Sequence, residues 1–187
     1  MSGDVHVRFC ESVGVKFPGA THLVVLARYA GSRLTEFVES QLETWLGLEI
    51  NRDKTRVVNL KEKGASLDFL GFTFRYCEDL QGRGWRYLNV SPSKKALQRE
   101  RQKLHERTDH RQCFQPLPQL VQELNRHLRG WANYFSFGYP RVAFRKINSY
   151  VRYRLQQHLR RRSQRPFRPP EGVTYYQQLE KLGLIRL

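Results

Sequence analysis

Residues 117–135 read LPQLVQELNRHLRGWANYF, and this stretch sets the helical character of the second half of the chain. Its apolar side chains recur every three or four residues, a spacing that places them on one face of an α-helix. The positions on this face are Leu117, Leu120, Val121, Leu124, Leu128, Trp131 and Phe135. The stretch predicts a helix from about Leu117 to Phe135 that turns one face toward a core.

The same helical spacing continues on both sides of this stretch. Upstream, Ser91-Pro92-Ser93 predicts the start of a basic helix that runs to about Arg107. Downstream, Gly138-Tyr139-Pro140 interrupts the pattern, and a third helix is expected from near Arg141. A short fourth helix is expected from Thr174 to about Leu182. The apolar positions of the third helix are Ala143, Phe144, Ile147, Tyr150, Val151, Leu155 and Leu159.

Residues 19–90 show a different pattern, with short strands around one helix. Leu23–Leu26 is an apolar run that predicts a buried strand, and Thr55–Leu60 alternates as a strand. Between them, Ser32 is a candidate helix cap and Gly47 a stop signal. One face of this helix carries Leu34, Phe37, Val38, Leu42, Trp45 and Leu46.

A hairpin is expected next. Residues 67–76 alternate aromatic and polar side chains around Gly71, and Trp85–Val90 predicts a partner strand. Residues 1–18 show no clear period and are poorly specified. The sequence therefore predicts an α+β chain with a boundary near Ser91.

Positive charge is concentrated in the second half of the chain. Residues 81–187 hold 23 Lys and Arg against 6 Asp and Glu, a net charge of +17. Residues 1–80 hold 10 against 11, a net charge of −1. Such an excess repels itself unless a polyanion neutralises it, which indicates nucleic acid ahead of anionic lipid.

Composition excludes several other classes of protein. The three cysteines, Cys10, Cys77 and Cys113, are isolated, so a zinc site or a disulfide framework is not expected. No apolar run approaches the ~20 residues of a membrane span, and the N-terminus lacks a signal-peptide pattern. We expect no membrane partner and a cytoplasmic location.

Four stretches, taken in this order, carry a resemblance to a known family. They are GLEINRDKT (47–55), FLGF (69–72), LNRHLRGWANYF (124–135) and the basic segment 160–170. From about Ala20 onward, the chain resembles the C-terminal part of a group II intron-encoded reverse transcriptase/maturase. The resemblance implies a partial palm with its primer-grip hairpin over residues 19–90. It also implies a three-helix, thumb-like maturase-specific domain, or domain X, over residues 91–187.

The chain departs from the family at the catalytic strand. The family has Tyr-Ala-Asp-Asp where this chain has Gly19-Ala20-Thr21-His22. Polymerisation requires two Mg²⁺ ions held by carboxylates, whereas Thr21 offers a neutral hydroxyl and His22 a nitrogen. We therefore expect no catalytic residue, no Mg²⁺ bound by the chain on its own and no polymerase activity. The fingers and the first half of the palm are absent, so the reading frame is expected to be truncated upstream.

The expected binding residues follow from the resemblance and from the charge pattern. The resemblance implies that Lys54 approaches a phosphate and that Gly71 lets the hairpin approach a primer. Asn125, Arg126, Arg129 and Asn133 lie beside the apolar face of the second helix, where they can reach phosphates and 2′-hydroxyls. The expected basic stripe beyond them comprises Arg141, Arg145, Lys146, Arg152, Arg154, Arg160, Arg161, Arg162, Arg165 and Arg168.

The leading hypothesis is a truncated maturase that binds structured group II intron RNA, assists splicing and has lost polymerase activity. A template–primer duplex is a further expected partner. Three alternatives remain open: the C-terminal subunit of a split reverse transcriptase completed by another chain, a general basic RNA-binding protein, and a product without a selected role. The sequence does not determine which RNA is bound, whether a second chain participates, or the oligomeric state.

Overall fold

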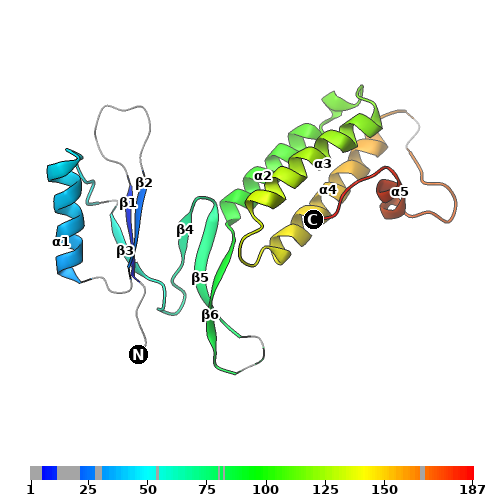
Figure 1. Cartoon of the computed structure of the whole chain (residues 1–187). Helices are drawn as coiled ribbons and strands as arrows, with labels where there is room; N and C mark the ends of the chain where they lie inside the picture. The colour runs from blue at the N-terminus through cyan, green and yellow to red at the C-terminus, as the bar shows by residue number, and fades with distance from the viewer. Residues whose placement is uncertain are drawn as a thin grey trace. The chain divides into compact units, whose positions relative to one another are not determined.

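The structure is a computed structural model that describes residues 6–11, 22–27, 31–53, 55–79, 81, 83–164 and 167–187. Strands dominate its first half and helices its second (Figure 1), so the predicted α+β class is confirmed. The chain divides into two compact units. The first is Met1–Phe69 with Phe74–Asn89, and the second is Leu70–Thr73 with Val90–Leu187.

The first unit contains a three-stranded antiparallel sheet in the order β2–β1–β3. Its strands are β1 (His6–Glu11), β2 (His22–Ala27) and β3 (Arg56–Asn59). The sequence predicted β2 and β3 but no element before residue 19. The structure instead places β1 there as the central strand, with Arg8 opposite Val25 on one side and Val57 on the other.

The helix of the first unit is α1 (Ser32–Ser40), which continues as the π-helical segment η1 (Gln41–Trp45). Gly31 occupies its N-cap in place of the expected Ser32. Of the predicted apolar face, only Leu42 is buried, and it packs with Ile50. Trp45 is 79% exposed. This helix is amphipathic in sequence but is little covered by the described part of the chain.

The predicted hairpin forms the second sheet, in the order β4–β5–β6. Its strands are β4 (Leu67–Phe69), β5 (Phe72–Glu78) and β6 (Arg86–Pro92). The two-residue turn between β4 and β5 has φ of 48° at Leu70 and 82° at Gly71. Positive φ at both positions is the requirement of a type I′ turn, which matches the twist of a hairpin.

The second unit is helical, and its elements begin and end close to the predicted positions. They are α2 (Lys94–Arg107), a 3₁₀ turn η2 (His110–Gln112), α3 (Leu117–Tyr134), α4 (Arg141–Arg161) and α5 (Tyr175–Lys181). Ser93 caps α2 by accepting a hydrogen bond from the Ala96 N–H at 3.1 Å. Thr174 caps α5 in a capping box with Gln177.

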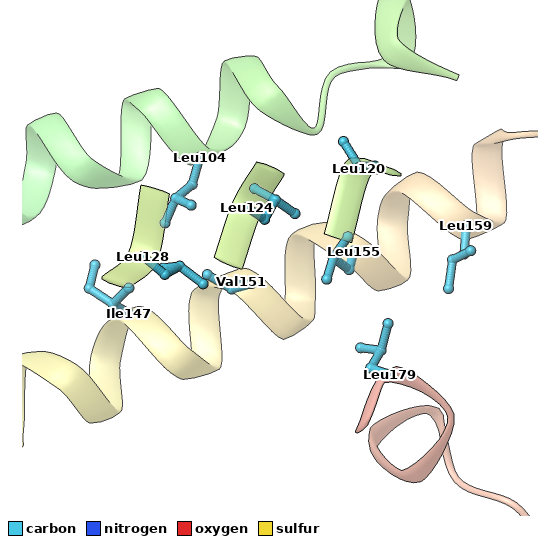
Figure 2. Close-up of a cluster of buried hydrophobic side chains, with 9 residues drawn as sticks. All are labelled: Leu104, Leu120, Leu124, Leu128, Ile147, Val151, Leu155, Leu159 and Leu179. Carbon is cyan, nitrogen blue, oxygen red and sulfur yellow. The ribbon is translucent and has the colours of Figure 1, made fainter. Parts of the chain in front are cut away.

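One apolar core joins the four helices (Figure 2). α2 contributes Leu104 and α5 contributes Leu179, while α3 and α4 supply the remainder from their predicted apolar faces. Burial of each such side chain contributes about 1.5–3 kcal/mol, so this core is the main source of stability in the second unit. Its buried members are Leu104, Leu120, Leu124, Leu128, Ile147, Val151, Leu155, Leu159 and Leu179.

Two asparagine side chains fasten the segment after α5 to the helices. Asn125 of α3 donates to the Gly183 carbonyl at 2.7 Å and accepts from the Ile185 N–H at 3.0 Å. Asn148 of α4 makes the same pair of contacts with the main chain of Leu187, at 3.0 and 3.1 Å. Residues 183–187 are thereby fixed across α3 and α4.

The tip of the β4–β5 hairpin belongs to the helical unit. The Tyr134 hydroxyl donates to the Leu70 carbonyl at 2.8 Å, and the Ser93 N–H donates to the Gly71 carbonyl at 2.7 Å. A Cβ placed on Gly71 would lie 3.3 Å from Cζ of Phe135. A glycine is therefore favoured here, because φ of 82° strains other residues and a Cβ would require a small shift of the Phe135 ring.

Candidate nucleic-acid interface

Helix α4 has one buried face and one basic face. Ile147, Val151 and Leu155 point into the core. Arg145, Ser149, Arg152, Gln156 and Arg160 recur at the same three- and four-residue spacing on the other side of the helix. Of these, Arg145 and Arg160 are exposed and Arg152 is half-buried.

A shallow groove of about 420 Å³ runs between α2 and α4. Three of its lining side chains are cationic: Arg101 comes from α2, and Arg145 and Lys146 come from α4. Ser149, Tyr150 and Tyr153 of α4 complete the lining. The guanidinium of Arg101 lies over the Tyr150 ring, 5.8 Å from its centroid.

A second hollow of about 560 Å³ lies between α4 and the segment that contains α5. Ser149 and Tyr153 line both hollows, so the two adjoin each other. On the α5 side, the Arg152 guanidinium lies 5.0 Å from the ring centroid of Tyr176, which is 57% exposed. We call the surface formed by these two adjoining hollows the α4 groove. No Asp or Glu is among the described residues that line it.

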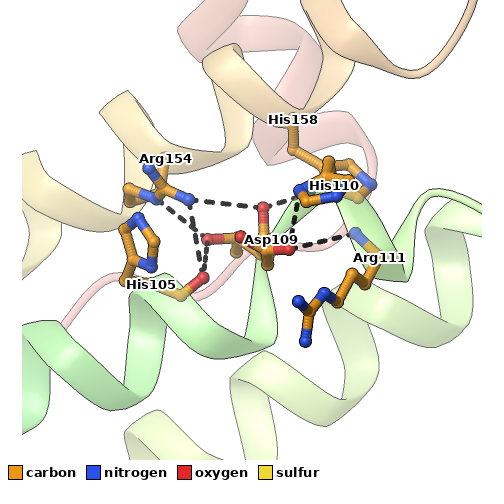
Figure 3. A network of polar contacts seen from close by, with 7 residues as sticks. His105, Asp109, His110, Arg111, Arg154 and His158 are labelled. Atoms are coloured by element: carbon orange, nitrogen blue, oxygen red, sulfur yellow. Dashed lines mark hydrogen bonds and ion pairs between the residues drawn. The ribbon is translucent and has the colours of Figure 1, made fainter.

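The last turn of α2 is held by a buried polar network (Figure 3). Arg154 of α4, only 8% exposed, donates from Nε to the Thr108 hydroxyl at 3.1 Å. Its Nη2 lies 3.5 Å from the carbonyl oxygens of His105 and Thr108. Nδ1 of the buried His158 lies 3.3 Å from that Thr108 oxygen. The network brings side-chain donors to carbonyls at the end of the helix, where the regular intrahelical hydrogen bonds run out.

Residues 97–172 match the family model of the group II intron, maturase-specific domain. This part of the chain is a maturase-specific domain. The match begins inside α2 and ends before α5, so it covers the groove wall formed by α2 and α4 but not the Tyr176 side. No curated protein matches the chain.

The maturase domain exposes most of the predicted cations. Arg126, Arg129 and Asn133 lie exposed along one face of α3, at a spacing of three and four residues. The exposed members of the predicted stripe on and after α4 are Arg141, Arg145, Lys146, Arg160, Arg161 and Arg168, with Arg152 and Arg162 half-buried. Whether each of them contacts RNA stays a prediction.

The prediction that Arg154 belongs to the basic stripe is wrong. The sequence placed it in the basic stripe, but its guanidinium is buried and bonded to the end of α2 within the maturase domain. Its position three residues after Val151 and four before His158 puts it on the core face. Arg154 is therefore a structural residue and does not belong to the exposed basic surface.

Two further residues, Asn125 and Gly71, make contacts within the protein that explain why these residue types occur at these positions. Both hydrogen-bonding ends of the Asn125 amide are occupied by the main chain of residues 183–185. Gly71, predicted to approach a primer, packs against Phe135 and Ala96 of the maturase domain. These contacts within the protein explain both residues without a contact to nucleic acid, and any contact to nucleic acid stays a prediction.

Some predicted positions fall outside the described residues. These are Lys54, Arg165 and Thr21; for His22 the structure describes the backbone, within β2, but not the side chain. Elsewhere in the described ranges, no group of three or more His, Cys, Asp or Glu side chains is placed to hold a metal ion. No helix among the described residues is long and apolar enough to cross a membrane.

The sequence analysis missed the aromatic part of the groove. Tyr153, 54% exposed, and Tyr176 lie beside cations on the maturase domain and the segment that follows it. Tyr150 packs against the core, as its assignment to the core face predicted, and it also lines the groove under Arg101. A signal was present in Arg152-Tyr153, where a cation and a ring adjoin on the outer face of α4.

Proposed function

We propose that the chain binds structured group II intron RNA through its maturase domain and assists splicing of that RNA. The match of residues 97–172 to the maturase-specific domain carries this proposal. The groove supports it, because four cations and no carboxylate face it among the described lining residues. Arginine and lysine neutralise phosphates, and groups on structured RNA such as 2′-hydroxyls accept hydrogen bonds from the same side chains.

The proposal excludes polymerisation by this chain alone. The family's reaction uses Mg²⁺ held by carboxylates, and the donors at the matching positions, Thr21 and His22, do not fit that ion. RNA binding by the arginine-rich surface requires no such metal site.

The test compares two RNAs of equal length, a group II intron RNA and an unrelated folded RNA, in filter-binding titrations with the full chain. We expect tighter binding of the intron RNA and faster intron splicing in the presence of the chain. Equal affinity for both RNAs, with no effect on splicing, would instead identify a general RNA-binding protein.

A second candidate is the C-terminal subunit of a reverse transcriptase that another chain completes. The exposed apolar face of α1, with Phe37 and Trp45, favours it, as does the edge position of β2 and β3 within the described strands. A primer-extension assay with Mg²⁺ separates the candidates. Extension that appears only on addition of a partner chain supports the subunit, whereas extension by the purified chain contradicts both proposals.

A further inference from the structure

We propose that the α4 groove binds unpaired nucleotides of RNA, with a base stacked on Tyr153 and the adjoining phosphates on Arg145, Lys146 and Arg152. This inference rests on the proposed function and specifies which part of an RNA occupies this surface. It also assigns a binding role to Tyr153, which charge alone does not indicate.

The first step of the argument is the exposure of the rings. Tyr153 is 54% exposed and Tyr176 57% exposed, although each lies in a hollow rather than on a protruding loop. The Tyr150 and Tyr153 rings lie 6.5 Å apart at 39° to each other, so they do not cover each other face to face. A tyrosine left open in this way offers a stacking surface to a planar ligand.

The second step is the combination of rings with cations. Arg101 lies over Tyr150 and Arg152 over Tyr176, and Arg145 and Lys146 line the same groove. Aromatic faces beside a positively charged groove are the two elements by which proteins hold single strands. An acidic peptide would satisfy the cations but would leave the rings without a planar partner.

The third step distinguishes unpaired nucleotides from a duplex. In a duplex the faces of the bases are already stacked on one another, so they are not available to a side chain. A helix bound at this surface would contact the cations alone. The two adjoining hollows have volumes of about 420 and 560 Å³, within the range of ligand sites, so they have room for bases that enter from a single strand.

The experiment measures fluorescence anisotropy of a labelled oligouridine of about 12 nucleotides, a length within the range of single-strand sites, and of its duplex with oligoadenosine. Tyr153→Ala is expected to weaken binding of the single strand by about 5- to 150-fold and binding of the duplex less than about twofold. Tyr153→Phe retains the ring and is expected to bind like the unmodified chain. Tyr139→Ala, at a tyrosine that is 53% exposed outside the groove lining, is the matched control.

The inference is overturned if Tyr153→Ala weakens both RNAs equally or neither, or if Tyr153→Phe is as damaging as Tyr153→Ala. Circular dichroism verifies folding of each variant. As a measurement that needs no variant, 4-thiouridine in the single strand is expected to cross-link to the peptide containing Tyr153, and cross-links elsewhere only would contradict the assignment. Oligouridine binding without any preference for intron RNA would refute the proposed function and leave the groove assignment standing.

Discussion

At the scale of single residues, two arginines of α4 are expected to have different roles, one in stability and one in RNA binding. Arg154 is buried against the end of α2, while Arg152, two positions earlier, faces the groove. We expect Arg154→Ala to lower the free energy of unfolding by about 2–4 kcal/mol, because it removes the buried hydrogen bonds of the guanidinium to Thr108 and leaves a cavity beside the end of α2. Arg152→Ala is expected to cost less than about 1 kcal/mol but to weaken RNA binding. Urea denaturation and RNA titration of both variants check this; a reversed pattern would contradict the assignment.

His158 is expected to make the stability of the bundle depend on pH. Burial lowers the pKa of its imidazole, opposed by its hydrogen bond to the Thr108 carbonyl and assisted by the nearby charges of Arg162 and Arg154. The folded state therefore favours the neutral ring, and the unfolded chain binds a proton more readily. The resulting stabilisation is fully present above the unfolded-state pKa of about 6.5 and is lost as pH falls from there through the lowered pKa of the folded state.

Thermal denaturation between about pH 7.5 and pH 5 measures this effect. The melting temperature of the unmodified chain is expected to fall on acidification, and His158→Gln is expected to flatten that fall. His105→Gln changes an exposed histidine on α2 and is the matched control. An equal slope in the unmodified chain and in His158→Gln would show that other groups cause the pH dependence.

At the scale of elements, local signals in the sequence predicted the helical unit closely. Ser93 and Thr174 are side-chain caps, and the helices after them begin at the next residue. The strand β1 was not predicted, although Val7 and Phe9 alternate with the polar His6 and Arg8, because so short an alternation does not by itself indicate which strands it pairs with. The apolar face of α1 was predicted, but most of this face is not buried by the described residues. Burial depends on what packs against a face, which the local sequence does not determine.

The candidate site was predicted less well than the fold. Charge pattern identifies basic side chains but does not distinguish the buried Arg154 from the surface Arg152. Helical periodicity does distinguish them, because Val151, Arg154 and His158 share one face. The groove itself was not predictable from local pattern, since its walls come from α2, α4 and the α5 segment.

The segment after α5 is an element whose position depends on two asparagines. Each of Asn125 and Asn148 donates to and accepts from its main chain, as a neighbouring strand would. We expect Asn148→Ala to lower the free energy of unfolding by about 1–3 kcal/mol and to accelerate amide exchange at Leu187. Asn133→Ala, on the exposed face of α3, is the control. Unchanged exchange in Asn148→Ala would show that apolar packing alone fixes the segment.

At the scale of the whole molecule, fold and charge divide the chain in the same way. The strand-rich part is almost neutral, whereas residues 81–187 carry a net charge of +17. The helical unit combines this charge with a continuous apolar core. A stable scaffold can hold many like charges at the surface, because the energy of burial offsets their mutual repulsion until a polyanion binds.

This distribution of charge predicts a strong dependence of RNA binding on salt. If about six to ten phosphates are neutralised, affinity falls by about 10³–10⁵ between 50 and 200 mM salt, because binding releases the counterions condensed on the RNA. We expect the double variant Arg145→Gln/Lys146→Gln to reduce the slope of log affinity against log salt by about 1.5, since two phosphate contacts are lost. The double variant Lys181→Gln/Arg186→Gln removes an equal charge from exposed positions outside the groove lining and is expected to leave the slope nearly unchanged. Equal slopes for both double variants would show that the net charge of the unit, rather than the groove, attracts the RNA.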